Sequence, residues 1–259
     1  MEPTNTPQVP TRETPAAPAP KQVNYILPAA ILVAAILISG SILATGGVTG
    51  GRRVLPSNTN TPPAAPLGSD INAIKPISKS DRIRGNADAQ VIIVEFSDTE
   101  CPFCKVFHET MKKLMDEYGS SGKLAWVYRH FPIDGLHSRA RAEAEAVECA
   151  GVVGGDNGYW SYLDEIFLRT NSNNTLNPLE LPKIAKDIGL DLSAFEKCVS
   201  SKETAKKVSA DGLDAVNSGA QGTPYSVLIV QKSGKKIPIS GALPYGEVKQ
   251  MIDSALLGK

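Results

Sequence analysis

The sequence has no excess of charge of either sign and contains few cysteines. Lys and Arg together number 27, and Asp and Glu also number 27, so the formal net charge is zero. A chain without a net positive field has no general attraction for phosphate backbones, so nucleic acid is not an expected partner. The four cysteines are too few for a small disulfide-packed domain, although their even number is compatible with an oxidising compartment.

Sequence repeats are also absent, and long hydrophobic runs are almost absent. The lack of a fixed period argues against solenoid and propeller folds. One apolar run, residues 26–43, lies inside a stretch without charged residues from 22 to 51. Its length predicts a single transmembrane helix within residues 23–48. A cleaved signal peptide is the alternative, but the region before the run is long and only weakly basic.

Composition divides the rest of the chain. Residues 1–22 are rich in Pro, Thr and Ala, which predicts a disordered N-terminal tail. Residues 49–70 contain several prolines among Ser, Asn and Thr, which is typical of an extended linker. We therefore expect the folded domain to comprise residues 71–259, with its orientation across a membrane left open by nearly balanced flanking charges.

The predicted domain mixes strand and helix periodicities, which favours an α/β fold. Residues 91–96 form a short, β-branched run typical of a central strand that is buried on both faces. A second strand is predicted at 124–128, and several helices are predicted between 138 and about 218. The pattern then predicts a hairpin from strands 225–230 and 236–240, and a final amphipathic helix over 245–257.

A Cys-x-x-Cys motif lies where the predicted central strand passes into a helix. It consists of Cys101, Pro102, Phe103 and Cys104. This spacing brings two sulfurs within bonding range and leaves the first sulfur near the helix N-terminus, where backbone N–H groups stabilise a thiolate. We therefore expect Cys101 to be the attacked sulfur and Cys104 the resolving thiol. Pro102 is tolerated at the first helical position and stiffens the turn.

Two other uses of such a motif are an inert disulfide and half of a zinc site. Zinc would need further ligands, and no second Cys-x-x-Cys is present. His108 follows Cys104 by four positions on one helical face, but neither His130 nor His137 offers a paired ligand spacing, so we predict no metal. Against an inert disulfide stand the strand-to-helix position, the charged Glu95 within an apolar strand, and a distant Gly-Thr-Pro sequence at 222–224 before another apolar strand.

These residues carry a resemblance to DsbA-type members of the thioredoxin superfamily. The sequences at 94–98, 128–132, 148–150 and 222–224 occur in that family's order. The resemblance covers the folded domain and implies a thioredoxin-like fold with a helical insertion between its two halves. It also implies that Pro224 is cis and faces the active-site disulfide, and that Thr223 offers backbone groups to bound peptide.

Glu95 precedes Cys101 by six residues, where the family places a buried acidic group below the disulfide. Its expected role is to take or return the Cys104 proton. Burial should raise its pKa, because a carboxylate inside an apolar run is poorly solvated. An ordinary charge at a strand end is the alternative.

The second position of the dipeptide between the cysteines departs from DsbA itself, which has histidine where this chain has Phe103. A phenyl ring cannot stabilise the Cys101 thiolate by charge. Asp98 and Glu100 should disfavour that thiolate further, which predicts a weaker oxidant than DsbA and leaves the direction of catalysis open.

The other two cysteines fall in the predicted helical insertion. Cys149 and Cys198 both share helical faces with apolar residues, so both are expected to point inward. A disulfide between them and a pair of buried free thiols are both compatible with the sequence.

The sequence therefore predicts a membrane-anchored protein-disulfide oxidoreductase with no bound cofactor and an extracytoplasmic catalytic domain. The resemblance implies that its substrates are unfolded or reduced secreted proteins. It also implies a membrane redox partner that passes electrons to quinone. The alternatives are a reductase or isomerase of the same fold and a peptide-binding, chaperone-like module.

Overall fold

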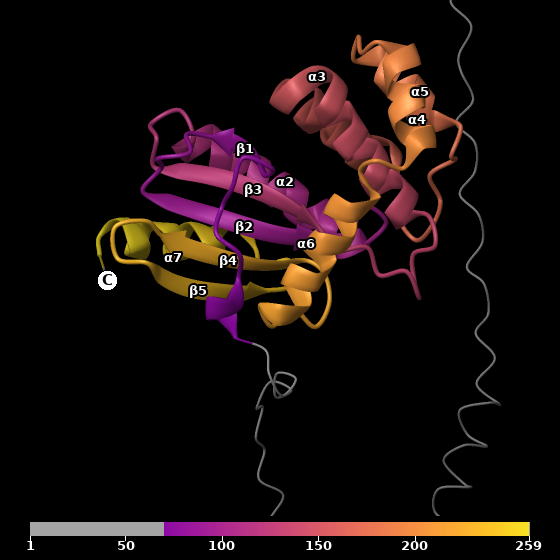
Figure 1. The fold of residues 1–259 in the computed structure, drawn as a ribbon. Helices are drawn as coiled ribbons and strands as arrows, with labels where there is room; N and C mark the ends of the chain where they lie inside the picture. The colour runs from indigo at the N-terminus through magenta and orange to yellow at the C-terminus, as the bar shows by residue number, and fades with distance from the viewer. Residues whose placement is uncertain (1–69, 259) are drawn as a thin grey trace, which may run out of the picture. The chain divides into compact units, whose positions relative to one another are not determined.

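The computed structural model describes residues 70–258, and its core is a five-stranded sheet with three helices on its faces (Figure 1). The chain order of the elements is η1 (Ile71–Ala73), β1 (Arg82–Gly85), β2 (Val91–Ser97), α2 (Pro102–Tyr118), β3 (Leu124–His130), α3 (Ala140–Arg169), α4 (Glu180–Asp187), α5 (Leu192–Ser201), α6 (Ala205–Asn217), β4 (Tyr225–Val230), β5 (Lys235–Ser240) and α7 (Tyr245–Leu256).

The strand order in the sheet is β1-β3-β2-β4-β5. β2 is parallel to β3, and the other neighbouring strands are antiparallel. Every residue of β2 and β3 is buried, which explains why the sequence of β2 is almost wholly apolar. The predicted central strand, the hairpin of β4 and β5, and the final helix are confirmed. The short edge strand β1 was not predicted, because four residues with two arginines carry too little periodicity.

Two hydrophobic clusters cover the two faces of the sheet. α2 and α7 pack on one face, and α6 packs on the other (Figure 1). On β2, Val91 and Ile93 belong to the cluster under α2, whereas Ile92 and Val94 belong to the cluster on the opposite face. Because side chains alternate along a strand, the side chains of Glu95 and Ser97 point to the face of the sheet that α2 covers.

The helical insertion between β3 and β4 is confirmed and consists of α3 to α6. α3 is broken at Gly155, whose φ of 63° lies in the left-handed region that glycine adopts readily. A disulfide joins Cys149 of α3 to Cys198 of α5, with 5.7 Å between the two Cα atoms. The insertion is therefore cross-linked internally, between two of its helices.

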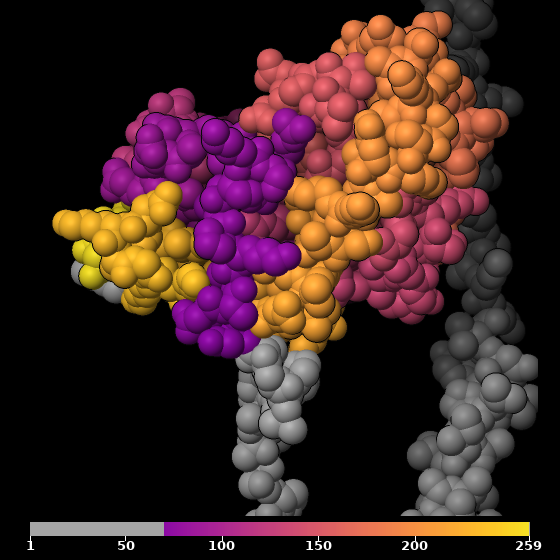
Figure 2. Space-filling model, viewed as in Figure 1, coloured from indigo at the N-terminus to yellow at the C-terminus, as the bar shows by residue number. Residues whose placement is uncertain are grey.

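Arg129 fastens the beginning of the described chain to the sheet. Its guanidinium group forms buried ion pairs with Asp81 and Asp214 and donates hydrogen bonds to the carbonyl oxygens of Lys75 and Pro76. A buried guanidinium needs such complete pairing to offset its lost hydration. Figure 2 shows the resulting arrangement, in which the indigo N-terminal residues lie between α6 in orange and the yellow C-terminal region.

The predicted tail 1–22, the predicted transmembrane helix 23–48 and nearly all of the predicted linker 49–70 lie outside the described residues. Within residues 70–258, no helix combines the length and apolar character that crossing a bilayer requires.

Candidate active site

Cys101 and Cys104 lie at the N-terminus of α2, directly after the loop that leaves β2. Cys101 is the residue that precedes the helix, and Pro102 occupies the first helical position. Both cysteines are in the thiol state. The predicted position at a strand-to-helix junction is therefore found, and it leaves the backbone N–H groups of the first helical turn directed toward the Cys101 sulfur.

Cys101 has an environment that favours its thiolate. Its thiol lies 3.4 Å from the carbonyl oxygen of Thr223, to which it donates a hydrogen bond. The hydrogen bond from Cys104 lowers the pKa of Cys101 to about 6, with help from Thr223 and from the backbone N–H groups of Phe103 and Cys104, and against an opposing effect of burial. A thiol with this pKa is mostly ionised at neutral pH, which makes Cys101 a good leaving group.

Cys104 has the opposite character. It is fully buried, and its sulfur accepts a hydrogen bond from the backbone N–H of Asp98 at 3.4 Å. Burial, followed by the neighbouring Cys101 and Glu95, raises the pKa of Cys104 well above its ordinary value. A thiolate formed at Cys104 when its bond to Cys101 breaks is therefore unstable and requires a proton.

Glu95 is fully buried on β2, as expected. Its Oε2 atom accepts a hydrogen bond from the indole nitrogen of Trp126 at 3.0 Å, and its Oε1 atom forms no hydrogen bond. Burial raises the pKa of Glu95 to about 8, and the nearby Ser97 hydroxyl and the hydrogen bond from Trp126 oppose that rise. Because the charge on Glu95 also raises the pKa of Cys104, the two groups lie close enough to influence each other's ionisation.

Asp98 and Glu100, which on sequence grounds should disfavour the Cys101 thiolate, are both held by other groups. Asp98 binds the backbone N–H groups of Glu100 and Ile133 and the imidazole of His137. The Glu100 carboxylate accepts backbone N–H groups from the loop at 174–176. Both carboxylates are thus bound by other groups, and neither is among the causes that set the lowered pKa of Cys101.

A carboxyl pair behind the motif was missed by sequence reasoning. Glu143 of α3 is buried and accepts a hydrogen bond from the Thr99 hydroxyl at 2.6 Å. Burial, followed by the interaction with Glu100, raises the pKa of Glu143 to about 8. The two glutamates are 43 positions apart in the sequence (143 minus 100), so only the packing of α3 against the loop brings them together.

Of the predicted substrate-binding and active-site-turn residues, Thr223 contacts the Cys101 sulfur. The peptide bond between Thr223 and Pro224 is cis, and the Thr223 carbonyl reaches Cys101 as described above. Phe103 is 66% exposed and Val106, further along α2, is 59% exposed. Two apolar side chains of α2 are thus exposed within five positions of Cys101.

The three histidines have protein partners rather than metal-like arrangements. His108 pairs with Asp164, His130 lies near Glu148, and His137 pairs with Asp98. Among residues 70–258, no group of three or more His, Cys, Asp or Glu side chains is arranged to hold a metal ion.

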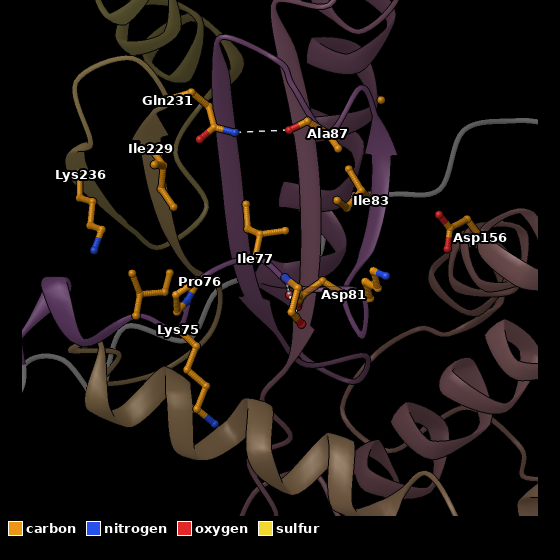
Figure 3. Close-up of a pocket in the computed structure, with 14 residues that line it drawn as sticks. Lys75, Pro76, Ile77, Asp81, Ile83, Ala87, Asp156, Ile229, Gln231 and Lys236 are labelled. Atoms are coloured by element: carbon orange, nitrogen blue, oxygen red, sulfur yellow. Dashed lines mark hydrogen bonds between the residues drawn. The ribbon is translucent and has the colours of Figure 1, made fainter.

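A pocket of about 950 Å³ lies on the other side of the sheet and is separate from this chemistry. Figure 3 shows Ile77, Ile83 and Ile229 among its apolar lining, with Lys75 and Lys236 also lining it. The isoleucines belong to the cluster on the face opposite α2, and neither cysteine of the motif lines the pocket.

The fold and the site together define a class: a thioredoxin-fold protein with a low-pKa cysteine at a helix N-terminus and a partner cysteine one turn into that helix. Comparison with known proteins agrees with that class. A family profile described as thioredoxin matches residues 78–253, so the chain belongs to this family. Its fold and site are those of a DsbA-like thiol-disulfide oxidoreductase.

Solved structures of similar fold include DsbA2 of Pseudomonas aeruginosa. It is 28% identical, with a TM-score of 0.58, and the match covers 69% of this chain and 96% of that protein. Oxidised BdbD of Bacillus subtilis is 23% identical, with a TM-score of 0.60, and the match covers 69% and 94% of the two chains. The latter likeness concerns the fold alone.

The sequence is also similar to part of a longer protein that is named as an ion antiporter. Na(+)/H(+) antiporter NhaA 3 of Salinispora tropica is 31% identical over 144 residues, which are 56% of this chain and 21% of the antiporter. The chain thus spans about a fifth of the length of the curated relatives that it matches.

Proposed function

We propose that the chain is an enzyme that donates the disulfide of Cys101 and Cys104 to proteins outside the cytoplasm. The observation that carries this proposal is the contrast between the two cysteines. Cys101 has a pKa of about 6 beside the Thr223 carbonyl, whereas Cys104 is fully buried with a raised pKa. Stabilising the reduced form through the Cys101 thiolate makes a disulfide more oxidising.

The proposed reaction begins with the oxidised enzyme. A substrate thiolate attacks the Cys101 sulfur, the bond to Cys104 breaks, and Cys104 leaves as a thiolate that takes up a proton. A second substrate thiolate then attacks the substrate sulfur of the mixed disulfide, which releases Cys101 as a thiolate and leaves the substrate oxidised by two electrons. Glu95, protonated below a pKa of about 8, is the proposed source of the proton for Cys104.

Placement outside the cytoplasm, at a cell membrane through residues 23–48, belongs to the same proposal. It is supported by the disulfide between Cys149 and Cys198, because stable structural disulfides are typical of oxidising compartments. Unfolded or reduced secreted proteins are the proposed substrates. Reoxidation is assigned to a membrane partner linked to quinone, as the resemblance to DsbA implies.

The test is the reduction potential of the purified full chain, measured in glutathione redox buffers. A reversible two-electron transition above about −180 mV would support a disulfide donor, whereas a value near −270 mV, like that of thioredoxin, would indicate a reductase. The Cys101→Ser variant is the control and should show no such transition. If the wild-type chain also shows none, the motif has no redox role and the proposal fails.

A further inference from the structure

Four polar atoms lie unpaired in the space between β2, β3, β4 and α2. They are Oε1 of Glu95, Oγ of Ser97, the hydroxyl oxygen of Tyr128 and Oγ of Ser226, and each is buried without a hydrogen bond. Buried polar groups are nearly always paired, because leaving one unpaired costs about 1–3 kcal/mol. A group of four such atoms beside a reactive cysteine is therefore unusual, and the position of each decides which of them can take part in the chemistry.

The sheet register brings these side chains together. Glu95 is paired with Tyr128 on β3 and with Ser226 on β4. Neighbouring residues in register point to the same face, and Ser97 follows Glu95 by two positions, so all four side chains lie on the face that α2 covers. Cys104 is fully buried in the same hydrophobic cluster as Tyr128.

Ser97 lies beside both Glu95 and Cys104. It follows Glu95 by two positions on the same face of β2, and the backbone N–H of the next residue, Asp98, donates a hydrogen bond to the Cys104 sulfur at 3.4 Å. The Ser97 hydroxyl has no hydrogen bond of normal length and angle, yet it lies close enough to lower the pKa of Glu95, Cys104 and Tyr128. A serine hydroxyl can donate one proton and accept another at the same time. It is thus suited to connect a thiol and a carboxyl group between which no hydrogen bond is formed.

We propose that the Ser97 hydroxyl is a proton relay between the Cys104 sulfur and the Glu95 carboxyl group. The proposal rests on the thiol-disulfide exchange proposed above and adds a residue to it. When a substrate thiolate breaks the bond between Cys101 and Cys104, the Ser97 hydroxyl gives its proton to the Cys104 thiolate. The same hydroxyl oxygen receives the proton of the Glu95 carboxyl group, so the products are a Cys104 thiol, an intact Ser97 and a Glu95 carboxylate.

The reverse transfer serves reoxidation. When Cys101 forms a mixed disulfide with an oxidant, the Cys104 thiol must lose its proton to attack the Cys101 sulfur. Ser97 passes that proton to the Glu95 carboxylate. Tyr128, whose pKa burial raises well above its ordinary value, remains protonated throughout and does not exchange its proton.

The test is the bimolecular rate constant for oxidation of a reduced dithiol peptide by the disulfide form of the full chain, between pH 5.5 and 8.5. General acid–base groups contribute roughly 10²–10⁴-fold to a rate, and Glu95 remains present, so Ser97→Ala should be about tenfold slower below pH 8. Ser97→Thr keeps the hydroxyl and should restore most of the rate. The matched control is Ser226→Ala, an equally buried and unpaired serine on β4, which should react like the wild type.

A double-mutant cycle separates a relay from a packing effect. If Ser97 acts through Glu95, adding Ser97→Ala to Glu95→Gln should slow the reaction by less than about twofold, because interacting residues are not additive. If Ser97→Ala slows the Glu95→Gln variant as much as it slows the wild type, the proposal is overturned. A Ser97→Ala variant with the wild-type rate and pH profile would also overturn it.

Two further outcomes keep the test decisive. If Ser97→Ala does not fold, the test is the solvent isotope effect on the wild-type rate. That rate should be lower in D₂O than in H₂O, and equal rates would overturn the relay. If the wild-type chain transfers no disulfide at all, the proposed function fails and the relay fails with it. If the wild type exchanges disulfides normally and Ser97→Ala reacts at the same rate, the relay is overturned but the proposed function is not.

Discussion

The thiol of Cys101 lies 3.4 Å from the carbonyl oxygen of Thr223, a residue 122 positions later in the chain. This contact joins the N-terminus of α2 to the loop before β4, so the reactive sulfur sits where the two halves of the thioredoxin fold meet. The acceptor is a backbone carbonyl, and an acceptor of the thiol proton does not itself lower the pKa of that thiol. The lowered pKa of Cys101 is therefore assigned first to the hydrogen bond from Cys104, with smaller contributions from the Thr223 side chain and the backbone N–H groups of Phe103 and Cys104.

Replacing Cys104 should show how much of the lowered Cys101 pKa comes from the Cys104 hydrogen bond and how much from the N-terminus of α2. In Cys104→Ala, the pKa of Cys101 should rise from about 6 toward the ordinary value of 9.0, because the largest cause of its lowering is removed. Once that pKa exceeds 7, each further unit reduces the thiolate fraction at pH 7 about tenfold. Cys104→Ser keeps a donor and should shift the pKa less. The measurement is the rate of iodoacetamide alkylation against pH, and identical midpoints in the two variants would contradict this assignment.

Glu95 should make the folded protein less stable as the pH rises. Its folded pKa of about 8 lies above the ordinary 4.5, so between these values the native state holds a proton that the unfolded state has lost. The free energy of unfolding then falls by up to about 1.4 kcal/mol per pH unit over that window and levels off above pH 8.

Glu95→Gln removes this contribution and keeps a hydrogen-bond acceptor for Trp126. We expect the difference in unfolding free energy between wild type and variant to change with pH from about 5 to 8, measured by urea denaturation with both proteins in the same redox state. Glu143, whose pKa is also about 8, contributes to both proteins and cancels in the difference. Parallel stability curves would show that Glu95 is ionised at neutral pH.

Glu100 should hold the insertion loop against the catalytic turn. Its carboxylate accepts the backbone N–H groups of Asn174, Thr175 and Leu176 at 2.6 to 3.3 Å. Glu100→Ala leaves those donors unpaired and should lower the unfolding free energy by about 2–3 kcal/mol, with faster proteolysis near residue 174. Glu109→Ala, at an exposed glutamate on α2, is the matched control. Equal proteolysis of the two variants would exclude this role.

The fold and the two cysteines of the motif could be predicted because their signals are local. The β2 run, the turn after it and the helical periodicity of α2 occupy consecutive residues, and they place Cys101 at a helix start without tertiary information. Glu95 also stands out locally, since a charge inside an apolar strand is exceptional.

The partners of these residues could not be predicted, because they depend on register and packing. The hydrogen bond between Glu95 and Trp126 crosses from β2 to β3, and Glu143 reaches the motif only through the position of α3. Ser97 is an ordinary residue in the sequence. Its proposed role becomes visible only when the pairing of β2 with β3 and the packing of α2 on the sheet bring Ser97 into the region of Tyr128 and Cys104.

The disulfide between Cys149 and Cys198 should stabilise the fold without affecting the chemistry of Cys101. It closes a loop of 49 positions between α3 and α5, and removing a cross-link of this kind costs roughly 2–4 kcal/mol, mainly because the unfolded chain gains freedom. A variant with both cysteines changed to alanine should therefore unfold at lower urea concentration. Its Cys101 should still be alkylated with a midpoint near pH 6, since neither cysteine is among the groups that set the Cys101 pKa. A shifted midpoint, or a changed reduction potential of the motif, would show that the insertion disulfide is coupled to the active site.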